Sequence, residues 1–520
     1  MYEVRRGDYC YKIAQDNGIS YDQLLRQNPG LSCVNLQVGQ SICLIPQSPS
    51  WDDWKGNGGW NDWNNNAGAR NLDSCRPYVV KEGDLCSRIA AANGLTFSEL
   101  VDLNENTPNW NETPAMSLSM YFQACKSMLG YFIGGKMLPS WDMEIQVFCD
   151  VVRHRNKQLF PESSDKTIDD IDYDKIHEGF AARPMPPSKL SIDVGVYCAH
   201  NITVSDCNLN PDWLPGIGVA EDPLRSLVEQ DTTNTSASRQ IPGELLACWS
   251  ACAVHGIHRN SHERALEMRP LADTEKIVLC LHGGSYVTGS PASHREVLGK
   301  LTERIKLRCF IIDYRLAPKH PFPAQLHDAF IAFQYLVNCG FKPHNIVLAG
   351  DSAGGHLCIN LVLLLRHIAK ATDKQLMPAG VMLFSPLPGI VLHGASLHAN
   401  TLFDYICSTP LEWPTSPLRL FYKPGQIYND EYRQEICDPL LTPAFGDLSE
   451  FPPTIIQSGS SEILIDDIRE LYEKLKLDNP EHGRILWEEY PEMVHVFHRF
   501  LRRPESQAAF DSLAKFVASL

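Results

Sequence analysis

The stretch IVLAGDSAGGHLCINLVLLL, residues 346–365, is the part of the sequence that decides the fold. Four apolar residues at 346–349 predict a buried strand, Gly-Asp-Ser-Ala-Gly follows at 350–354, and the residues behind it have a helical pattern. A bare Gly-x-Ser-x-Gly motif arises by chance in many chains, but a strand before it and a helix after it indicate a nucleophile elbow. The glycines allow a sharp turn that exposes Ser352 at a helix N-terminus, where the helix dipole favours negative charge. We therefore expect Ser352 to be a catalytic nucleophile.

Short apolar runs recur on both sides of this stretch from residue 274 onward and alternate with amphipathic segments. The other runs lie at 277–281, 309–312, 380–384, 454–457 and 484–488. Such runs, separated by helical patterns, predict an α/β fold with a mostly parallel sheet covered on both faces. Active sites in these sheets lie at the carboxyl ends of the strands, so the residues after each run are the candidates for the site.

A glycine pair follows the first of these runs, in the sequence His282-Gly283-Gly284-Ser285. Consecutive glycines allow backbone N–H groups to turn inward. We expect the N–H groups of Gly283, Gly284 and Ala353 to form an oxyanion hole, which holds the charge that develops on a substrate carbonyl oxygen. Taken alone, the motif also fits an ordinary glycine turn.

The acid and the base should follow the nucleophile in the chain, with the histidine last. His495 lies in a loop after the last apolar run and is the candidate base. His498 competes with it, but its place at the start of the final predicted helix favours a solvated or capping role. Glu462 comes just beyond a predicted strand, where a carboxylate can hold the imidazole of His495 in the required tautomer. The acidic pair at 466–467 is expected to cap or solvate the helix that follows.

Residues 276–520 resemble the hormone-sensitive-lipase family of α/β hydrolases, which includes arylacetamide-deacetylase-like esterases. Besides the motifs above, the resemblance rests on DYRLAPKHPFPA at 313–324, on Gly-x-x-Glu-x-Leu-x-Asp at 459–466 and on His-x-Phe at 495–497. Two positions depart from the family pattern: Ser285 replaces the third glycine of the oxyanion motif, and the acid is glutamate where aspartate is commoner.

The resemblance implies a mechanism and a substrate class. His495 would remove the proton of Ser352, which would attack an ester carbonyl and form an acyl-enzyme that water hydrolyses. The resemblance implies a small-molecule ester as substrate and requires no metal or cofactor. It also implies a lid over the pocket, built by a segment within residues 190–275.

The N-terminal region contains an internal repeat at a constant offset. Its first copy begins with a strand and closes with another at 36–44. Tyr2, Val4, Gly7, Asp8, Cys10, Ile13, Ala14, Asn17, Gly18, Leu24 and Asn28 recur as Tyr78, Val80, Gly83, Asp84, Cys86, Ile89, Ala90, Asn93, Gly94, Leu100 and Asn104. The spacing resembles fungal LysM domains, small βααβ modules that bind N-acetylglucosamine polymers such as chitin.

The LysM resemblance implies a sugar site between two loops of the first copy. The residues near the sugar would be Gly7, Asp8, Asn28, Pro29 and Leu31. The second copy departs from the pattern, since Ser119 stands where the offset places the partner of Cys43. The first copy is therefore the expected sugar-binding module.

The chain divides into segments of different composition. We expect a LysM-like domain at 1–48, a linker rich in Trp, Asn and Gly at 49–74, a second LysM-like domain at 75–125, an unassigned region with lid elements at 126–245 and the α/β-hydrolase catalytic domain at 246–520.

Bulk properties narrow the possible partners and compartment. A formal charge of −16 over 520 residues disfavours nucleic acid, and no run of about 18 apolar residues predicts a membrane span. Six of the seventeen cysteines lie in the first 125 residues, which favours a secreted, oxidised module. However, Met1 leads straight into the patterned segment without a basic and apolar leader. No cysteine spacing resembles a metal site.

Three hypotheses stay open at this stage. The chain is a carboxylesterase, held on chitin or active in fungal secondary metabolism; or it is a sugar-binding protein whose hydrolase half is inert; or it is an artificial union of two neighbouring genes. The complete set of Ser352, Glu462 and His495 argues against the inert half.

Overall fold

The computed structural model describes residues 2–3, 41–42, 123–124, 126–128, 131, 136–159, 196–233, 239–256, 262–480 and 484–520. The chain splits into two compact units, residues 1–79 and 80–520. In the first unit, β1 (Tyr2–Glu3) pairs antiparallel with β2 (Ser41–Ile42), which lies within the closing strand expected at 36–44. The expected sugar contacts at Gly7, Asp8, Asn28, Pro29 and Leu31 lie outside the described residues, as do the linker and most of the second repeat.

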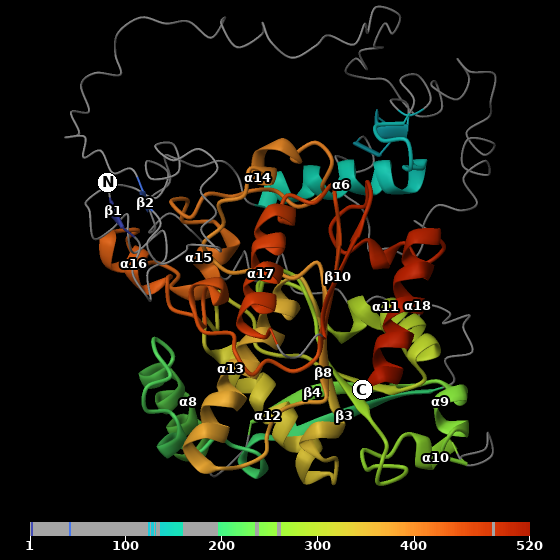
Figure 1. Ribbon diagram of the computed structural model, residues 1–520, viewed down its shortest axis with the longest axis vertical. Helices are drawn as coiled ribbons and strands as arrows, with labels where there is room; N and C mark the ends of the chain where they lie inside the picture. Colours follow the sequence, from blue (N-terminus) through green and yellow to red (C-terminus); the bar gives the residue numbers. More distant parts are fainter. Residues whose placement is uncertain are drawn as a thin grey trace, which may run out of the picture. The chain divides into compact units, whose positions relative to one another are not determined.

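An eight-stranded sheet forms the centre of the second unit (Figure 1). Its strands are β3 (Val196–Thr203), β4 (Gln240–Ala247), β5 (Ile277–Leu281), β6 (Arg308–Ile312), β7 (Ile346–Asp351), β8 (Gly380–Phe384), β9 (Thr454–Gly459) and β10 (Ile485–Tyr490). Their order is β10-β9-β8-β7-β5-β6-β4-β3, and only β4 runs antiparallel to its neighbours. The predicted mostly parallel sheet is therefore confirmed.

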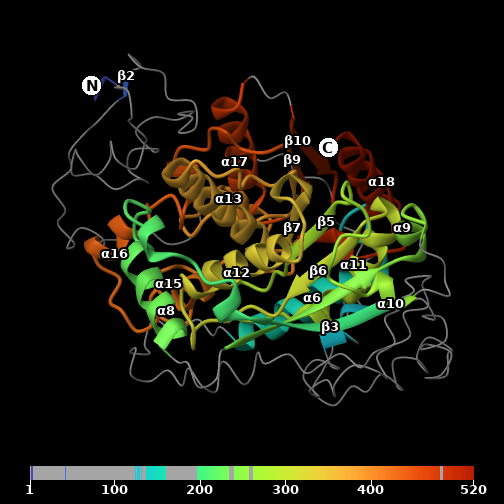
Figure 2. The same ribbon diagram turned by 90° about the horizontal axis from the view of Figure 1, so that it is seen from below.

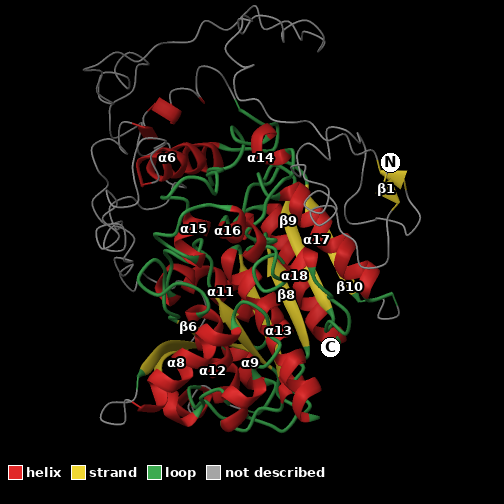
Figure 3. Ribbon diagram, turned by 90° about the vertical axis from the view of Figure 1, so that its left-hand side faces the viewer, coloured by secondary structure: helices red, strands yellow, loops and turns green. Residues whose placement is uncertain are grey.

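Helices cover both faces of this sheet (Figures 2 and 3). The longer ones are α8 (Glu221–Thr233), α11 (Pro291–Ile305), α12 (Ala324–Asn338), α13 (Ala353–Thr372), α17 (Ile465–Asp478) and α18 (Pro504–Ser519). Side chains alternate along β5, so that Leu279 packs in the cluster with α8, α12, α13 and α17, whereas Val278 packs with α11 and α18. Fully buried strands with apolar residues on both faces explain the continuous apolar runs in the sequence.

The remaining elements are short or lie outside these two layers. They are α6 (Met143–Leu159), α9 (Trp249–Ala253), α10 (His262–Ala265), α14 (Ser396–Ala399), α15 (Pro417–Tyr422), α16 (Asp430–Glu435) and the 3-10 turns η2 (Val204–Asp206), η3 (Pro211–Trp213), η5 (Pro343–Asn345), η6 (Pro443–Phe445) and η7 (Phe497–Arg499). Among the described helices, none combines the length and the apolar character that a membrane crossing requires.

The sheet begins earlier in the chain than the sequence predicts. Strands β3 and β4 belong to it, so the expected domain boundary at residue 246 falls inside β4. The segment expected to hold the lid, 190–275, supplies these two strands and α8 to the sheet and its cover. Helix α6, which precedes that segment, packs against the loop of His495.

Candidate active site

Ser352 lies at the tight turn between β7 and α13. Its backbone angles, φ 52° and ψ −120°, are of a kind that costs a non-glycine residue about 1–3 kcal/mol. A Cβ at Gly350 would lie 2.3 Å from the carbonyl oxygen of Gly354, and one at Gly354 would lie 2.0 Å from that of Leu281. The N–H of Ser352 donates to the carbonyl oxygen of Phe384, 2.9 Å away, at the end of β8. Strand, tight turn and helix thus follow one another as the motif predicts.

The candidate acid and base meet beyond the ends of β9 and β10. Nδ1 of His495 lies 2.9 Å from Oε2 of Glu462, and the two residues are 2% and 0% exposed. Because the carboxylate accepts the Nδ1 proton, Nε2 is the atom left to accept a proton in the neutral imidazole. This is the tautomer that a general base for a serine hydroxyl requires.

Two consecutive residues at the end of β8 connect the elbow to this pair. The carbonyl group of Phe384 holds the N–H of Ser352, while Oγ of Ser385 donates to Oε1 of Glu462 at 2.6 Å. The same Oγ accepts the N–H of Val496 at 2.9 Å. The nucleophile turn and the acid–base pair are therefore fixed against one short segment of main chain. No motif in the sequence marks Ser385.

The charges around His495 favour its protonated form. Burial alone would lower the pKa of His495, but the hydrogen bond and charge of Glu462, helped by the charge of Asp404, raise it. Asp404 is fully buried, and this burial raises its pKa to about 6 against the opposing effect of His495. An imidazolium formed during proton transfer would therefore be stabilised.

The position of His498 differs from the one that the sequence predicts. It lies in η7, is fully buried, and places Nε2 2.9 Å from Oε1 of Gln457. Burial lowers the pKa of His498 to about 3. The expected solvated or capping role is therefore wrong, because His498 packs inside the fold.

The loop after β5, which is expected to form the oxyanion hole, differs from that expectation in one N–H donor. The N–H of Gly283 donates to Oδ1 of Asp351 at 2.9 Å, so the expectation that this N–H faces a substrate is wrong. The carboxylate of Asp351 also lies 3.1 Å from Nε2 of His294. Burial raises the pKa of Asp351, but the imidazole of His294 outweighs this and holds it below its ordinary value. Gly283 therefore anchors the loop rather than supplying a donor.

The next two residues of that loop have backbone conformations that side chains rarely adopt. Gly284 has φ 120°, and a Cβ there would lie 2.2 Å from the carbonyl oxygen of Thr288. Ser285, which departs from the family pattern described above, has φ 53°. Ala353 is the first residue of α13, where N–H groups have no partner within the helix.

Helix α6 and the turn that precedes it pack on the segment that carries His495. Indole Nε1 of Trp141 donates to the carbonyl oxygen of Glu492 at 2.7 Å, and the N–H of Ser140 donates to Oε2 of the same residue at 2.7 Å. Trp141 is fully buried in a cluster that includes Tyr405 and Phe497. This helix is therefore part of the site's surroundings, although the sequence gives it no motif.

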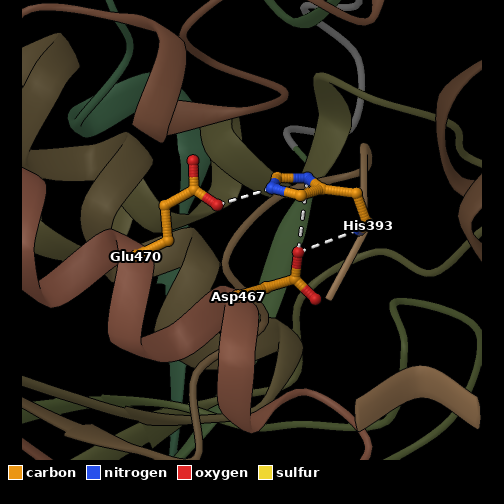
Figure 4. Close-up of side chains that lie close together, drawn as sticks. All are labelled: His393, Asp467 and Glu470. Atoms are coloured by element: carbon orange, nitrogen blue, oxygen red, sulfur yellow. Dashed lines mark hydrogen bonds and ion pairs between the residues drawn. The ribbon is translucent and has the colours of Figure 1, made fainter. Parts of the chain in front are cut away.

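A second cluster lies where the segment after β8 meets α17 (Figure 4). Nε2 of His393 lies 2.5 Å from Oε2 of Glu470, and its Nδ1 lies 3.5 Å from Oδ1 of Asp467. Asp467 also accepts the N–H groups of His393 and Gly394. One oxygen or nitrogen atom from each of the three residues lies within 4.8 Å of the other two. In the structure the two carboxylates bind His393, and the cluster fastens the segment to α17.

These contacts correct the expectation for the acidic pair at 466–467. Oδ2 of Asp466 accepts the N–H of Ser396 at 2.8 Å, and Asp467 binds the main chain at His393. Both carboxylates therefore hold the segment after β8 in place, because its main-chain N–H groups are shielded from water outside regular secondary structure and need acceptors.

Comparison with known proteins assigns two parts of the chain to families. Residues 278–499 match the protein family described as "alpha/beta hydrolase fold", and residues 2–44 and 78–109 match the LysM domain. An esterase of Acinetobacter venetianus is 32% identical over 263 residues, which cover 49% of this chain and 79% of the relative. An acetyl-hydrolase of Streptomyces hygroscopicus is 33% identical over 258 residues, 49% of this chain and 80% of the relative. Hormone-sensitive lipase of Mus musculus is 39% identical over 181 residues, 33% of this chain and 22% of that protein.

Proposed function

Because the chain belongs to the α/β-hydrolase family that contains these esterases, we propose that it hydrolyses carboxylic esters with Ser352 as nucleophile. The observation that carries the proposal is the 2.9 Å bond between Glu462 and His495, fixed to the same main-chain segment as the turn of Ser352. The named esterase and acetyl-hydrolase relatives support the same reaction class.

In the first half of the proposed reaction, Nε2 of His495 accepts the proton of the Ser352 hydroxyl as its oxygen attacks the ester carbonyl. Glu462 stabilises the imidazolium that forms. The carbonyl oxygen gains negative charge, which we assign to the N–H groups of Gly284, Ser285 and Ala353. This assignment keeps two of the three donors expected from the sequence and replaces Gly283, whose N–H binds Asp351.

In the second half, the imidazolium of His495 returns its proton to the leaving alcohol, and the acyl group remains on Ser352. A water molecule then gives a proton to the imidazole and attacks the acyl-enzyme. As the carboxylic acid leaves, the imidazolium returns that proton to Oγ of Ser352, so that the enzyme is regenerated.

The N-terminal part of the chain supports a second part of the proposed function, which is binding to a sugar polymer. Residues 2–44 and 78–109 belong to the LysM domains, and we propose that the first copy holds the enzyme on N-acetylglucosamine polymers such as chitin. Its contacts would be Gly7, Asp8, Asn28, Pro29 and Leu31. The alternative is a sugar-binding protein with an inert hydrolase half, and the buried bond between Glu462 and His495 argues against it.

Hydrolysis of p-nitrophenyl acetate and butyrate separates these alternatives. The purified chain should release p-nitrophenol, and the Ser352→Ala variant, folded by circular dichroism, should not. Equal release by both proteins would refute the role of Ser352. Absence of release by the folded wild-type chain would favour the inert-hydrolase alternative.

A further inference from the structure

A second carboxylate, Asp404, lies beside the acid–base pair, and the reaction described above gives it no role. It is 0% exposed and follows α14. The N–H of Ile463, the residue after Glu462, donates to Oδ2 of Asp404 at 2.8 Å. Oδ1 accepts the N–H of Tyr405 at 2.8 Å and lies 3.4 Å from the N–H of His495. One buried carboxylate thus contacts the main chain of both the acid's segment and the base.

The segment of Asp404 is held in turn by α6. Nε of Arg153 donates to the carbonyl oxygen of Asp404 at 2.9 Å, and Nη2 of Arg153 donates to that of Leu402 at 2.9 Å. Nδ2 of Asn156 donates to the carbonyl oxygen of Tyr405 at 3.2 Å. In Figures 1 and 3, α6 and α14 lie at the same end of the sheet. The position of the carboxylate is therefore determined by elements on both sides of it.

We propose that Asp404 is a positioning residue for the esterase reaction: it aligns the segments of Glu462 and His495 and adds a second negative charge that stabilises the imidazolium. Its catalytic consequence rests on the proposed function, whereas its effect on His495 does not. Asparagine at this position would keep one acceptor oxygen and lose the charge, so the pKa of His495 is the readout that separates the effect of the charge from that of alignment.

Charge and burial make this effect large enough to measure. Ionised groups interact more strongly inside a protein than in water, since the effective dielectric constant is lower. The groups that face Asp404 are His495 and Glu462, Cys149 and Arg153 of α6, and Tyr405 and Cys407 of its own segment. Of these, His495 is the group whose protonation changes in the catalytic cycle, so it is the one through which Asp404 would act.

Asp438 offers a matched control. It is a partly buried aspartate that, like Asp404, accepts main-chain N–H groups on both oxygens, from Val219 at 3.0 Å and from Leu440 at 2.9 Å. Burial raises the pKa of Asp438 too. Its substitution by asparagine removes the same charge and the same kind of acceptor, but away from His495.

The experiment compares the full-length wild-type chain with Asp404→Asn and Asp438→Asn. Two readouts are used: the pH profile of kcat/KM for p-nitrophenyl butyrate, and the pKa of His495 from NMR of ¹⁵N-histidine-labelled protein, which needs no activity. We expect Asp404→Asn to lower kcat/KM at pH 8 by about tenfold, as one unit of pKa implies, and to move the acid limb and the NMR pKa to lower pH. Asp438→Asn should leave both unchanged.

Several outcomes would overturn the proposal. If Asp404→Asn lowers the rate but moves neither the acid limb nor the pKa of His495, Asp404 has only a structural role. If the rate and the pKa of His495 in Asp404→Asn equal those of the wild-type chain, Asp404 has no role in the site. If wild type itself is inactive, the proposed function fails, but the NMR pKa still decides the role of Asp404. If Asp404→Asn does not fold, Arg153→Ala loosens the segment without touching the carboxylate, and an unchanged pKa of His495 in it would also refute the proposal.

Discussion

The imidazole of His495 is almost fully buried, so its protonation depends on neighbouring charges that water screens poorly. Glu462 contacts Nδ1 directly, and Asp404 contacts the main chain of the same residue. Each carboxylate acts against the effect of burial, which favours the neutral ring. The balance of these effects determines the pH range in which the residue can accept a proton.

The pH dependence of the reaction follows from this balance. His495 must be neutral to accept the serine proton, and its pKa is raised above the ordinary value of 6.5. Activity should therefore fall as the pH decreases through a midpoint above 6.5. The profile of kcat/KM for p-nitrophenyl butyrate measures this midpoint, and a midpoint below 6.5 would contradict the charge arrangement.

The hydrogen bond of Glu462 should be essential for the base. In Glu462→Gln the amide has no charge to stabilise the imidazolium, so we expect kcat to fall by about a thousandfold or more. Steady-state kinetics with p-nitrophenyl acetate measure the loss. Glu470→Gln is the control, because Glu470 also bonds a histidine, His393, outside the acid–base pair. Similar losses in both variants would count against the assignment.

For individual site residues, the sequence predicts only those that lie in or next to a local motif. Ser352 lies in its motif, and Glu462 and His495 follow strands, as α/β hydrolase sites require. Ser385 and Asp404 are invisible in the sequence, because Asp404 reaches Ile463 and His495 across 59 and 91 residues. Gly283 was expected to donate to a substrate, but Asp351, 68 residues away, accepts its N–H. Long-range polar contacts leave no local pattern.

Among the elements, β6 begins with a buried cation. Arg308 is 1% exposed and pairs with Glu275, 2% exposed, at 2.8 Å. Its guanidinium also donates to the carbonyl oxygens of Ala265, Glu267 and Arg269. The start of a central strand is thereby joined to the α10–β5 connection.

Removal of this cation should destabilise the hydrolase unit. Arg308→Ala leaves a buried carboxylate without its partner, so we expect the free energy of unfolding to fall by about 3–5 kcal/mol. Urea denaturation followed by circular dichroism measures the change. Arg304→Ala, which breaks the exposed pair with Asp511, should cost less than about 1 kcal/mol. Equal costs would show that burial of the pair does not matter.

The six apolar runs in the sequence all form strands. Five of them, β5 to β9, are buried along their whole length, and parallel strands covered on both faces are apolar throughout. The sixth forms β10, which is the partly buried strand at one edge of the sheet. β3 is the strand at the other edge and β4 is its neighbour; β3 carries polar residues such as His200 and Asn201, and β4 contains Pro242 and Gly243. These residues are depleted in strands, so the sequence signal is weak there.

On the scale of the whole molecule, the chain joins LysM domains to an α/β hydrolase. The repeat that predicts the LysM domains is visible because its glycines, asparagines and cysteines recur at one offset. In the proposed function, sugar binding would concentrate the enzyme at an N-acetylglucosamine polymer. This would raise the effective concentration of the enzyme for esters on that polymer.

Binding to chitin tests this combination. The full-length chain should leave the supernatant when mixed with insoluble chitin, and soluble N-acetylglucosamine oligomers should release it. Asn28→Ala should weaken binding, because this residue is one of the expected sugar contacts, and should leave ester hydrolysis unchanged. If the chain stays in solution at every chitin concentration, the sugar-targeting part of the proposal is wrong.

The most direct test of the central claim is to identify the residue that becomes acylated. The full-length chain is treated with a fluorophosphonate, which reacts with activated serine hydroxyls, and its peptides are examined by mass spectrometry. We expect one adduct, on Ser352, formed rapidly in the wild-type chain and much more slowly in Glu462→Gln. An adduct on another serine, or no adduct on the folded protein, would contradict the assignment of Ser352 as the nucleophile.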